Sequence, residues 1–401
     1  MKDRYDVVIV GGAVIGSSVA YHLAANPDFD GSVLVVERDP SYAKASTALS
    51  ASGIRVQYSN PINVKVSQYG NEVIRNFAEA MAVGDDRPDL NFHPGGYLYL
   101  AGTAEQAQTL RENHVAQKAC GADVVLWQRD ELARAFPHLR VEDIELASYG
   151  QSGEGWFNNT GLMQGFKAKA RALGAEYVTD EVVAIGRDGD TVTTVTLKSG
   201  AVVAAGTVVN ASGPRAAQVA RMAGLDIPVE PRKRTLFVFD CAQTPEGTAG
   251  VNDGRLPLMI DPTGVWCRPE GKYFLAGAVP EDDPAVDWDD FEPRYGEFEE
   301  LIWPALAERS PQFEAIKVVN QWAGHYAYNT LDHNMVVGRH PEVTNFIFAN
   351  GFSGHGLQQG PATGRGVSEL IAYGGYRTLD LSEAGFERII EGRPFLEKAI
   401  I

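Results

Sequence analysis

The sequence predicts an α/β fold in which a Rossmann-like domain is interleaved along the chain with an α+β domain built on an antiparallel sheet. A strand–turn–helix–strand pattern over residues 6–37 opens the chain and has the size of one βαβ unit. Strand-like apolar runs return at residues 202–210 and 346–350. Between these two runs, shorter strand-like runs at residues 236–239, 264–268 and 272–276 indicate the antiparallel sheet. The 401 residues exceed the usual size of a single-core domain, so two domains are expected.

The first unit is the clearest part of the pattern. Residues 6–10, Asp-Val-Val-Ile-Val, form a β-branched run that suits a strand buried on both faces. Alanine and leucine favour a helix over residues 17–25, which stops before Pro27. Residues 33–37 then predict a second strand.

The remaining elements follow from helical or alternating spacing. Helices are expected over residues 63–81, 104–120, 129–136, 160–173, 288–309 and 361–372. Further strands are expected over residues 97–100, 181–186 and 191–197.

The order of these elements divides the chain between two discontinuous domains. We expect residues 1–90, 150–225 and 325–401 to form the Rossmann-like domain. Residues 91–149 and 226–324 are expected to form the second domain.

Composition excludes several classes of function. Lys and Arg number 35 against 52 Asp and Glu, and a net charge of −17 repels phosphate backbones, so no nucleic-acid partner is expected. The three cysteines are far apart and the eight histidines lack metal-ligand spacing, so neither disulfides nor a metal site is predicted. No apolar signal-peptide core follows Met1, and no uncharged apolar run approaches the roughly 18 residues of a membrane span. A cytoplasmic protein without a membrane span is therefore expected.

A glycine-rich turn, Gly11-Gly12-Ala13-Val14-Ile15-Gly16, lies between the first strand and the first helix. Gly11 and Gly16 match the G-x-G-x-x-G dinucleotide fingerprint, and Ala13 replaces its middle glycine. The helix N-terminus offers unpaired N–H groups to a pyrophosphate. Glu37 follows the second strand at 37 − 16 = 21 residues after Gly16, where a carboxylate accepts hydrogen bonds from ribose hydroxyls and disfavours NADP. The turn predicts a dinucleotide site; a tight turn that only caps a structural βα unit is the alternative.

Two loops favour FAD over NAD as the dinucleotide. Residues 46–55, Ser-Thr-Ala-Leu-Ser-Ala-Ser-Gly-Ile-Arg, are small and rich in hydroxyl groups, so a large ligand can lie against their backbone. Residues 350–359 form a glycine-dense turn that leads into a helix. The positive end of that helix would stabilise the charge that develops on the flavin N1–C2=O edge on reduction.

These segments resemble the D-amino-acid-oxidase and sarcosine-oxidase (DAO) superfamily of FAD-dependent oxidoreductases. The resemblance is carried by residues 11–16 with Glu37, by residues 46–55, by residues 208–214 and by residues 338–359. Residues 228–234, 328–332 and 351–359 are similar to the subgroup that contains the mitochondrial FAD-dependent oxidoreductase domain-containing complex I assembly factor. The resemblance implies a glutathione-reductase-type FAD-binding domain and an antiparallel-sheet substrate domain.

The resemblance also implies roles for individual residues. Residues from Gly11 to Gly16 would hold the pyrophosphate, Glu37 the ribose, and Val182 the adenine through its backbone. The full set of implied cofactor-binding residues is Gly11, Ala13, Val14, Ile15, Gly16, Glu37, Arg38, Ser46, Thr47, Ser50, Ser52, Gly53, Ile54, Arg55, Val182, Ala211, Gly213, Gly338, Gly354, His355, Gly356, Leu357 and Gln358.

Two positions depart from the sarcosine oxidases that the family includes. Gln358 stands where those enzymes have a lysine for the substrate carboxylate. His325 aligns with the cysteine that tethers their flavin, so FAD is expected to be non-covalent, with a tether through His325 itself as the alternative. Both departures make sarcosine an unexpected substrate.

The chemistry implied by the resemblance is oxidation of a C–N bond next to a carboxylate, with hydride transfer to flavin N5 and hydrolysis of the imine. The expected substrate is a small N-substituted amino acid, such as an iminodiacetate- or N-methyl-type compound. A carboxylate needs a cation or several donors. Arg55, His325 and Gln358 are the candidate catalytic residues, and the candidate substrate-binding residues are Arg55, Arg268, Tyr326 and Tyr328.

Three alternatives stay open. A D-amino acid is a second possible substrate, and an assembly factor that keeps FAD only for structure is a possible non-enzymatic function. An NAD-dependent dehydrogenase is less favoured, because the chain lacks a second glycine fingerprint. Either oxygen or an electron carrier could accept the electrons.

Overall fold

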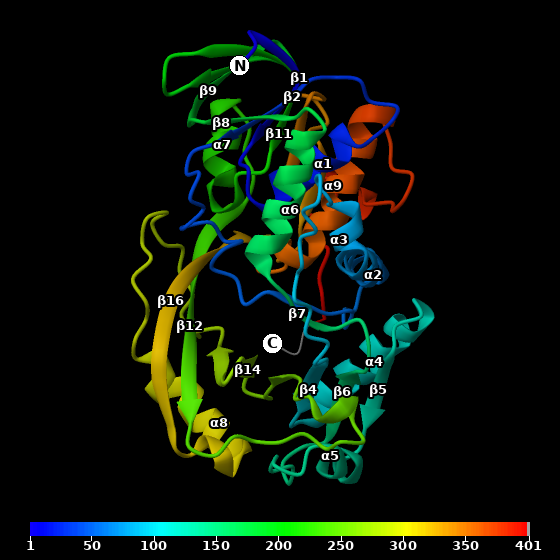
Figure 1. Ribbon diagram of the computed structural model, residues 1–401, viewed down its shortest axis with the longest axis vertical. Helices are drawn as coiled ribbons and strands as arrows, with labels where there is room; N and C mark the ends of the chain where they lie inside the picture. The colour runs from blue at the N-terminus through cyan, green and yellow to red at the C-terminus, as the bar shows by residue number, and fades with distance from the viewer. Residues whose placement is uncertain (399–401) are drawn as a thin grey trace.

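The computed structural model describes residues 1–398, which fold around two eight-stranded sheets. Figure 1 shows one sheet with its helices in the upper half of the molecule and the other in the lower half. The last three residues of the predicted Rossmann-like domain lie outside the described residues.

The first sheet has the strand order β17-β18-β11-β1-β2-β8, and β10 and β9 extend it from β11. β1 is parallel to both β2 and β11, and β11 is parallel to β18. This parallel centre explains the continuous apolar runs of the sequence, because both faces of these strands are buried. The strands are β1 (Arg4–Val10), β2 (Val33–Glu37), β8 (Glu176–Thr179), β9 (Val182–Asp188), β10 (Thr191–Leu197), β11 (Val202–Asn210), β17 (Val336–Arg339) and β18 (Phe346–Asn350).

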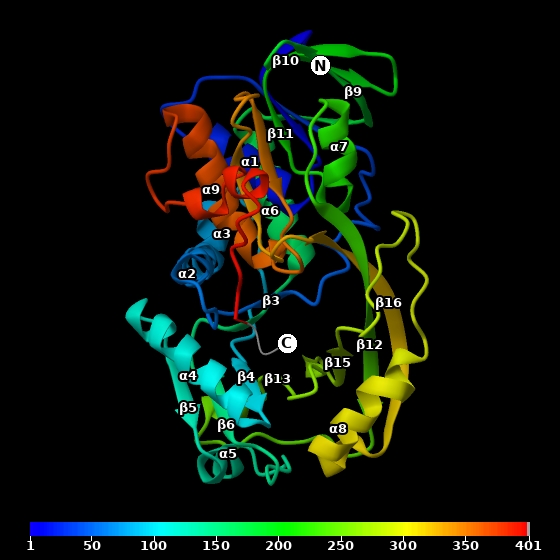
Figure 2. The same cartoon turned by 180° about the vertical axis from the view of Figure 1, so that it is seen from behind.

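Helices cover both faces of this sheet. Val19, Leu23 and Val367 pack on one face together with Ile9 and Val35. Figure 2 shows α7 on the opposite side of the sheet from α1 and α9. The helices of this half are α1 (Val14–Ala24), α2 (Pro61–Arg75), α3 (Phe77–Ala80), α6 (Asn159–Ala172), α7 (Ala216–Met222), α9 (Gly356–Tyr373) and α10 (Glu387–Ile390).

The second sheet has the order β16-β12-β15-β14-β13-β4-β6-β5 and is antiparallel except at the β13–β4 pair. Its two longest strands, β12 and β16, run from the lower half toward the first sheet in both views (Figures 1 and 2). The strands are β4 (Tyr97–Ala101), β5 (Val124–Trp127), β6 (Leu146–Gly150), β12 (Val229–Cys241), β13 (Leu258–Ile260), β14 (Trp266–Glu270), β15 (Tyr273–Gly277) and β16 (Ile316–Asn329). α4 (Ala104–Ala119), α5 (Arg129–Ala135) and α8 (Trp303–Arg309) accompany it, and a small ladder pairs β3 (Gly53–Ile54) with β7 (Gly155–Trp156).

The α/β fold with a parallel-centred sheet and a mainly antiparallel second sheet confirms the predicted fold class. The bounds of β11 and β18 are those predicted. The helix expected over residues 288–309 is wrong in its first part, because it starts only at a π-helical turn, Phe298–Ile302, followed by α8. Pro293 and a series of aspartate-stabilised turns occupy the first part instead.

Other elements also differ from expectation: β5, β6, β8, β13 and α7 were not predicted, and the helix expected over residues 63–81 is divided into α2 and α3. α9 starts at Gly356 rather than at 361, and Leu357 in its first turn belongs to the buried cluster that also contains Ile54 and Phe166. No strand is predicted over residues 316–329, which form β16 in a 13-residue pairing with β12. The predicted domain boundary between residues 324 and 325 falls inside this strand. Within residues 1–398, no helix has the length and apolar character needed to cross a membrane.

Candidate flavin and substrate site

The turn between β1 and α1 brings its backbone within reach of β11. Gly11 has φ +100°, and a Cβ there would lie 2.5 Å from the carbonyl oxygen of Ala211. A Cβ on Gly16 would overlap the carbonyl oxygen of Gly11, so both positions require glycine. Val14, the first residue of α1, donates its N–H only to a long contact with Thr47 Oγ1, at 3.3 Å. The start of α1 therefore has the open backbone that a pyrophosphate needs.

Glu37 is fixed at the end of β2 beside this turn. Its two carboxylate oxygens accept N–H bonds from Gly12 and Asp39, each at 2.8 Å. Arg38 pairs with Glu181 at 3.8 Å, next to Val182. A carboxylate held at this point keeps lone pairs for ribose hydroxyls.

One continuous cavity of about 710 Å³ runs from Glu37 and Val182 past the glycine turn to the N-terminus of α9 and the face of the second sheet. Among the predicted cofactor-binding residues, the following line it: Gly11, Ala13, Val14, Ile15, Glu37, Arg38, Ser46, Thr47, Ser50, Ser52, Gly53, Arg55, Val182, Ala211, Gly213, Gly354, His355, Gly356, Leu357 and Gln358. Gly16, Ile54 and Gly338 do not line it. Gly16 and Ile54 support lining residues from behind, whereas Gly338 packs against Gly385.

The shape and donors of this cavity fit FAD. A glycine cradle lies where a phosphate would approach, and a carboxylate lies at the ribose position. At the other end, the turn Ser353–His355 precedes the N-terminus of α9, and Gly354 (φ +97°) is exposed. The positive end of an 18-residue helix therefore faces the same cavity.

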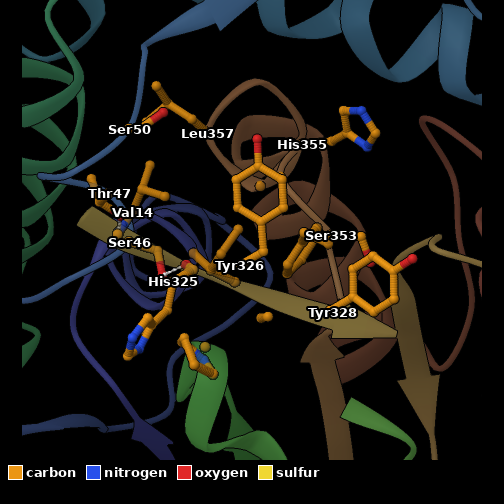
Figure 3. A pocket seen from close by; sticks show the side chains of 18 of the residues that line it. Val14, Ser46, Thr47, Ser50, His325, Tyr326, Tyr328, Ser353, His355 and Leu357 are labelled. Carbon is orange, nitrogen blue, oxygen red and sulfur yellow. Dashed lines mark hydrogen bonds between the residues drawn. The ribbon is translucent and has the colours of Figure 1, made fainter. Parts of the chain in front are cut away.

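The loop over residues 46–55 is held by three other elements. Ser46 Oγ donates to the carbonyl oxygen of His325 in β16 at 2.6 Å (Figure 3). Asn159 Nδ2, at the start of α6, donates to the carbonyl oxygen of Thr47 at 2.7 Å. Arg268 Nη2 in β14 donates to the carbonyl oxygen of Ala51 at 2.9 Å. These bonds give a small, flexible sequence one defined path along the cavity.

Arg55 lies at the end of this loop in a network with three other side chains. Its Nη2 bonds to His355 Nε2 at 3.1 Å, and its guanidinium lies 4.6 Å from the centre of the Tyr58 ring. Gln358 accepts from the backbone N–H of Arg55 at 2.9 Å and donates to Tyr58 Oη at 2.6 Å. Within residues 1–398, Arg55 has no carboxylate at ion-pair distance, and its Nε has no hydrogen-bond partner. Gln358 is thus committed to protein groups, whereas Arg55 keeps a free charge.

His355 accepts the bond from Arg55. Burial, together with the charge of Arg55, lowers the pKa of His355 to about 3. The imidazole is therefore neutral at physiological pH, and its proton must lie on Nδ1 because Nε2 is the acceptor.

The second sheet closes the cavity over this network. Tyr97 and Tyr99 of β4, Leu258 and Ile260 of β13 and Trp266 of β14 line it. Burial raises the pKa of Tyr99 to about 12, and it raises that of Tyr97 as well, so both phenols stay neutral. This wall is apolar and aromatic, with two hydroxyl groups.

Consecutive residues of β16 point in opposite directions, as a strand requires. Figure 3 shows the rings of Tyr326 and Tyr328 on one side, with His355, and the ring of His325 on the other. His325 Nε2 bonds to the carbonyl oxygen of Asp290 at 2.7 Å, and its ring stacks on Phe291 at 4.2 Å. His325 and Phe291 both line the cavity, but the imidazole is engaged with this loop and lies on the other side of the strand from Tyr326 and His355.

Arg268 is the one predicted substrate-binding residue that the structure keeps out of the cavity. It is 4% exposed, pairs with Glu270 and lies 5.1 Å from the ring of Trp156. Its contact with the site is the bond to Ala51 described above, so it supports the cofactor loop.

Several lining or adjacent residues were not predicted from the sequence. Tyr97, Tyr99 and Trp266 line the cavity, and the buried Glu154 binds the backbone next to Arg55. The aromatic-rich stretch at residues 97–99 was a signal for the first two. Within the described part of the chain, no cluster of metal-ligating residues is found.

Comparison with known proteins agrees with this geometry. Residues 6–370 match the family described as FAD dependent oxidoreductase (DAO). The chain is 41% identical over 433 residues to FAD-dependent oxidoreductase domain-containing protein 1 of Xenopus laevis, covering 100% of this chain and 85% of that protein. It is 26% identical over 388 residues to the glycine oxidase of Bacillus licheniformis, covering 92% and 94%. The structure of L-proline dehydrogenase from P. horikoshii matches with a TM-score of 0.85 at 25% identity, covering 98% of this chain and 100% of that one. The chain therefore belongs to the DAO family of FAD-dependent oxidoreductases, and its cofactor is FAD.

Proposed function

We propose that this protein oxidises the C–N bond of a small N-substituted (secondary) amino acid to an imine, which water then hydrolyses. The observation that carries this proposal is Arg55, a guanidinium without a carboxylate partner among the described residues, placed where the cofactor cavity meets the second sheet. Bound FAD supplies the acceptor for the hydride that leaves the α-carbon.

The chain's own residues position the substrate. Arg55 receives the substrate carboxylate, and the phenols of Tyr97 and Tyr99 are neutral donors beside it. Since a carboxylate bound to Arg55 is anchored at one end, the amine end is directed along the same cavity. Leu258, Ile260 and Trp266 exclude water from that region and leave an apolar surface for the N-substituent.

The other cations that line the cavity already have carboxylate partners. Arg234 pairs with Asp283 at 2.6 Å, and Arg215 and Lys44 approach Asp289 at 3.6 and 3.8 Å. A substrate with one carboxylate therefore suits the cavity better than a dicarboxylate such as iminodiacetate. The similarity to L-proline dehydrogenase supports this preference, because proline is a secondary amino acid with one carboxylate and an apolar ring.

The flavin is proposed to be held without a covalent bond. His325, at the aligned position for a tether, already bonds to Asp290 and stacks on Phe291. Acid precipitation tests this point, because non-covalent FAD is released to the supernatant and covalent flavin stays with the pellet.

The function is tested by anaerobic bleaching of the flavin's visible absorbance. The panel contains proline, N-methyl amino acids, sarcosine, iminodiacetate and D-amino acids. We expect a secondary amino acid with one carboxylate to bleach the flavin fastest, and readmitted air then distinguishes an oxidase from an enzyme that needs a carrier. Faster bleaching by a D-amino acid would replace the proposed substrate class. A loaded yellow protein that no compound bleaches would contradict the enzymatic proposal and favour an assembly factor that keeps FAD for structure.

A further inference from the structure

A short segment near the C-terminus borders the cavity on the side of α4. Residues 396–398 line the cavity there, and so do three residues of α4, Leu110, Asn113 and Gln117. Figure 2 shows this segment, in red, running down from the upper half of the molecule into the region between the two halves. Since FAD would occupy the part of the cavity between Glu37 and α9, the part at α4 is left for the entry of a substrate.

The segment is anchored first on the half of the molecule that holds the parallel-centred sheet. Arg388 in α10 forms an ion pair with Asp332, and both side chains are buried. The carboxylate of Asp332 also accepts the backbone N–H of Phe395 at 2.8 Å. Asn334 Nδ2 donates to the carbonyl oxygen of Phe395 at 2.5 Å. Because Asp332 itself lines the cavity, the segment leaves this half of the molecule at the edge of the cavity.

Glu397 fastens the middle of the segment to the start of α2. Its carboxylate accepts the backbone N–H of Ser59 at 2.7 Å, Ser59 Oγ at 2.5 Å, Asn60 Nδ2 at 3.0 Å and Asn63 Nδ2 at 2.5 Å. These groups are all donors, and they converge at the N-terminus of a 15-residue helix. Such a site suits an ionised carboxylate, whereas an amide would turn its own N–H groups toward these donors.

Lys398 joins the segment to α4 of the second domain. Its carbonyl oxygen accepts from Asn113 Nδ2 at 2.8 Å, and its Nζ pairs with Glu112 at 2.7 Å. Its backbone N–H donates to Ser59 Oγ at 2.8 Å. Residues 395–398, which we name the strap, therefore bridge the two domains by way of α2 and α4.

The strap lies beside the proposed carboxylate site. Ser59, which bonds to Glu397, directly follows Tyr58, whose ring lies 4.6 Å from the guanidinium of Arg55. A change in the contacts of Glu397 is therefore transmitted to the part of the cavity where a substrate is expected to bind.

Polar contacts, rather than a core of its own, hold the strap in place. Leu396 is 60% exposed although it is apolar, and residues 391–394 before the strap are exposed as well. Phe395 is only partly buried where it packs on the core of the first sheet. Segments with few buried apolar contacts open locally at a low free energy. The strap can therefore detach while the rest of the protein stays folded.

We propose that the strap closes the substrate end of the cavity and detaches to let ligands enter and leave, with Glu397 as its latch. In the closed state the strap helps to exclude water from the cavity. Glu397 is a positioning residue, because it acts on ligand exchange only through the strap. The inference goes beyond the proposed function, since it is independent of which amine is oxidised.

The test uses benzoate as the probe, because it carries a carboxylate and no amine to oxidise. Holoprotein is mixed rapidly with benzoate, and binding is followed by the change in the flavin's visible absorbance. If ligands enter only when the strap is detached, the observed binding rate levels off at high benzoate, at the rate of detachment. Hydrogen exchange of the C-terminal peptide reports the same opening without a ligand, because the N–H groups of Phe395 and Lys398 are bonded in the closed state.

Glu397→Gln removes the charge of the latch. The limiting binding rate should rise by about 10-fold to about 150-fold, the range expected for loss of one hydrogen bond to a charged group. The dissociation rate of benzoate should rise in parallel, so its affinity changes little, whereas general damage to the site would lower the affinity. The C-terminal peptide should also exchange faster. Glu391→Gln is the matched control, because this exposed carboxylate pairs with Arg393 at 2.9 Å and does not line the cavity, so both signals should stay unchanged.

A second variant and the unmodified protein keep the test decisive if Glu397→Gln does not fold. Ser59→Ala removes the hydroxyl group that bonds to both Glu397 and Lys398, so it should act in the same direction. A binding rate that rises linearly with benzoate in the unmodified protein, without a limit, overturns the strap as a gate. An unchanged limit or an unchanged hydrogen exchange in folded Glu397→Gln overturns Glu397 as its latch.

Failure of the proposed function has a different signature. Absence of benzoate binding at every concentration overturns the carboxylate site and with it the proposed function, and hydrogen exchange in Glu397→Gln then decides the strap alone. A protein that binds benzoate through a gated step but oxidises no amine keeps this inference and loses the proposed function.

Discussion

Replacement of Arg55 by methionine removes the guanidinium and keeps a long side chain. The substrate carboxylate would then enter a cavity whose other cations are paired, as with Arg234 and Asp283. Loss of one partner of a buried, hydrogen-bonded charge pair costs about 2–5 kcal/mol. Since about 1.36 kcal/mol is tenfold in rate, kcat/KM should fall by about 30-fold to about 5,000-fold. His355 loses a hydrogen bond in the same variant, but it is neutral and leaves no buried charge behind.

The assay compares variants that are matched for flavin content. Steady-state kinetics with the best substrate gives kcat/KM, and benzoate titration gives carboxylate affinity without turnover. Lys44→Met is the matched control, because Lys44 lines the cavity but is exposed and approaches Asp289, so both quantities should change little. If a flavin-loaded Arg55→Met protein had the same kcat/KM and the same benzoate affinity as the unmodified protein, the assignment of the carboxylate to Arg55 would be refuted.

Three further predictions concern the cofactor and stability. Glu37→Ala should weaken FAD binding by about 10-fold to about 100-fold, since two N–H groups and a ribose lose a charged acceptor; undiminished flavin after gel filtration would contradict this. Gly11→Ala should reduce flavin content and thermal stability. Gly121→Ala is the control, because Gly121 also has a positive φ but has open space around it, so this variant should lose only the stability that the backbone conformation costs. Equal losses in the two variants would show that the contact with Ala211 is unimportant. Burial lowers the pKa of His22 to about 4. As the pH falls below about 6.5, the histidine is therefore protonated in the unfolded chain before it is protonated in the folded protein. The free energy of unfolding should consequently be about 2.5 kcal/mol lower at pH 4.5 than at pH 7. Denaturant unfolding at pH 7 and 4.5 measures this, and a His22→Gln variant with the same acid loss would rule out His22 as its source.

The fold class and the cofactor were predictable because their signals are local. The glycine turn, Glu37 and the β-branched runs each occupy only a few neighbouring residues. The physical role of each can be inferred from those residues alone, and the structure shows that role. β16 was not predictable in this way. Its residues 324–329, Gly-His-Tyr-Ala-Tyr-Asn, mix small, polar and aromatic side chains, and the strand exists because it pairs with β12 over 13 residues. That pairing joins parts of the chain far apart in sequence, which no local pattern reports.

The sequence alone could have distinguished the two arginines that were predicted to bind the substrate carboxylate, Arg55 and Arg268. Arg268 is followed two residues later by Glu270, and side chains at i and i+2 of a strand share one face, so an ion pair between them is a local expectation. Arg232 and Glu230 on β12 form the same kind of pair, at 2.9 Å. Residues 46–58, around Arg55, contain no acidic side chain. An arginine in a strand with an acid two residues away is therefore best assigned to that acid, and an arginine in a cofactor loop without one is the better candidate for an anionic ligand.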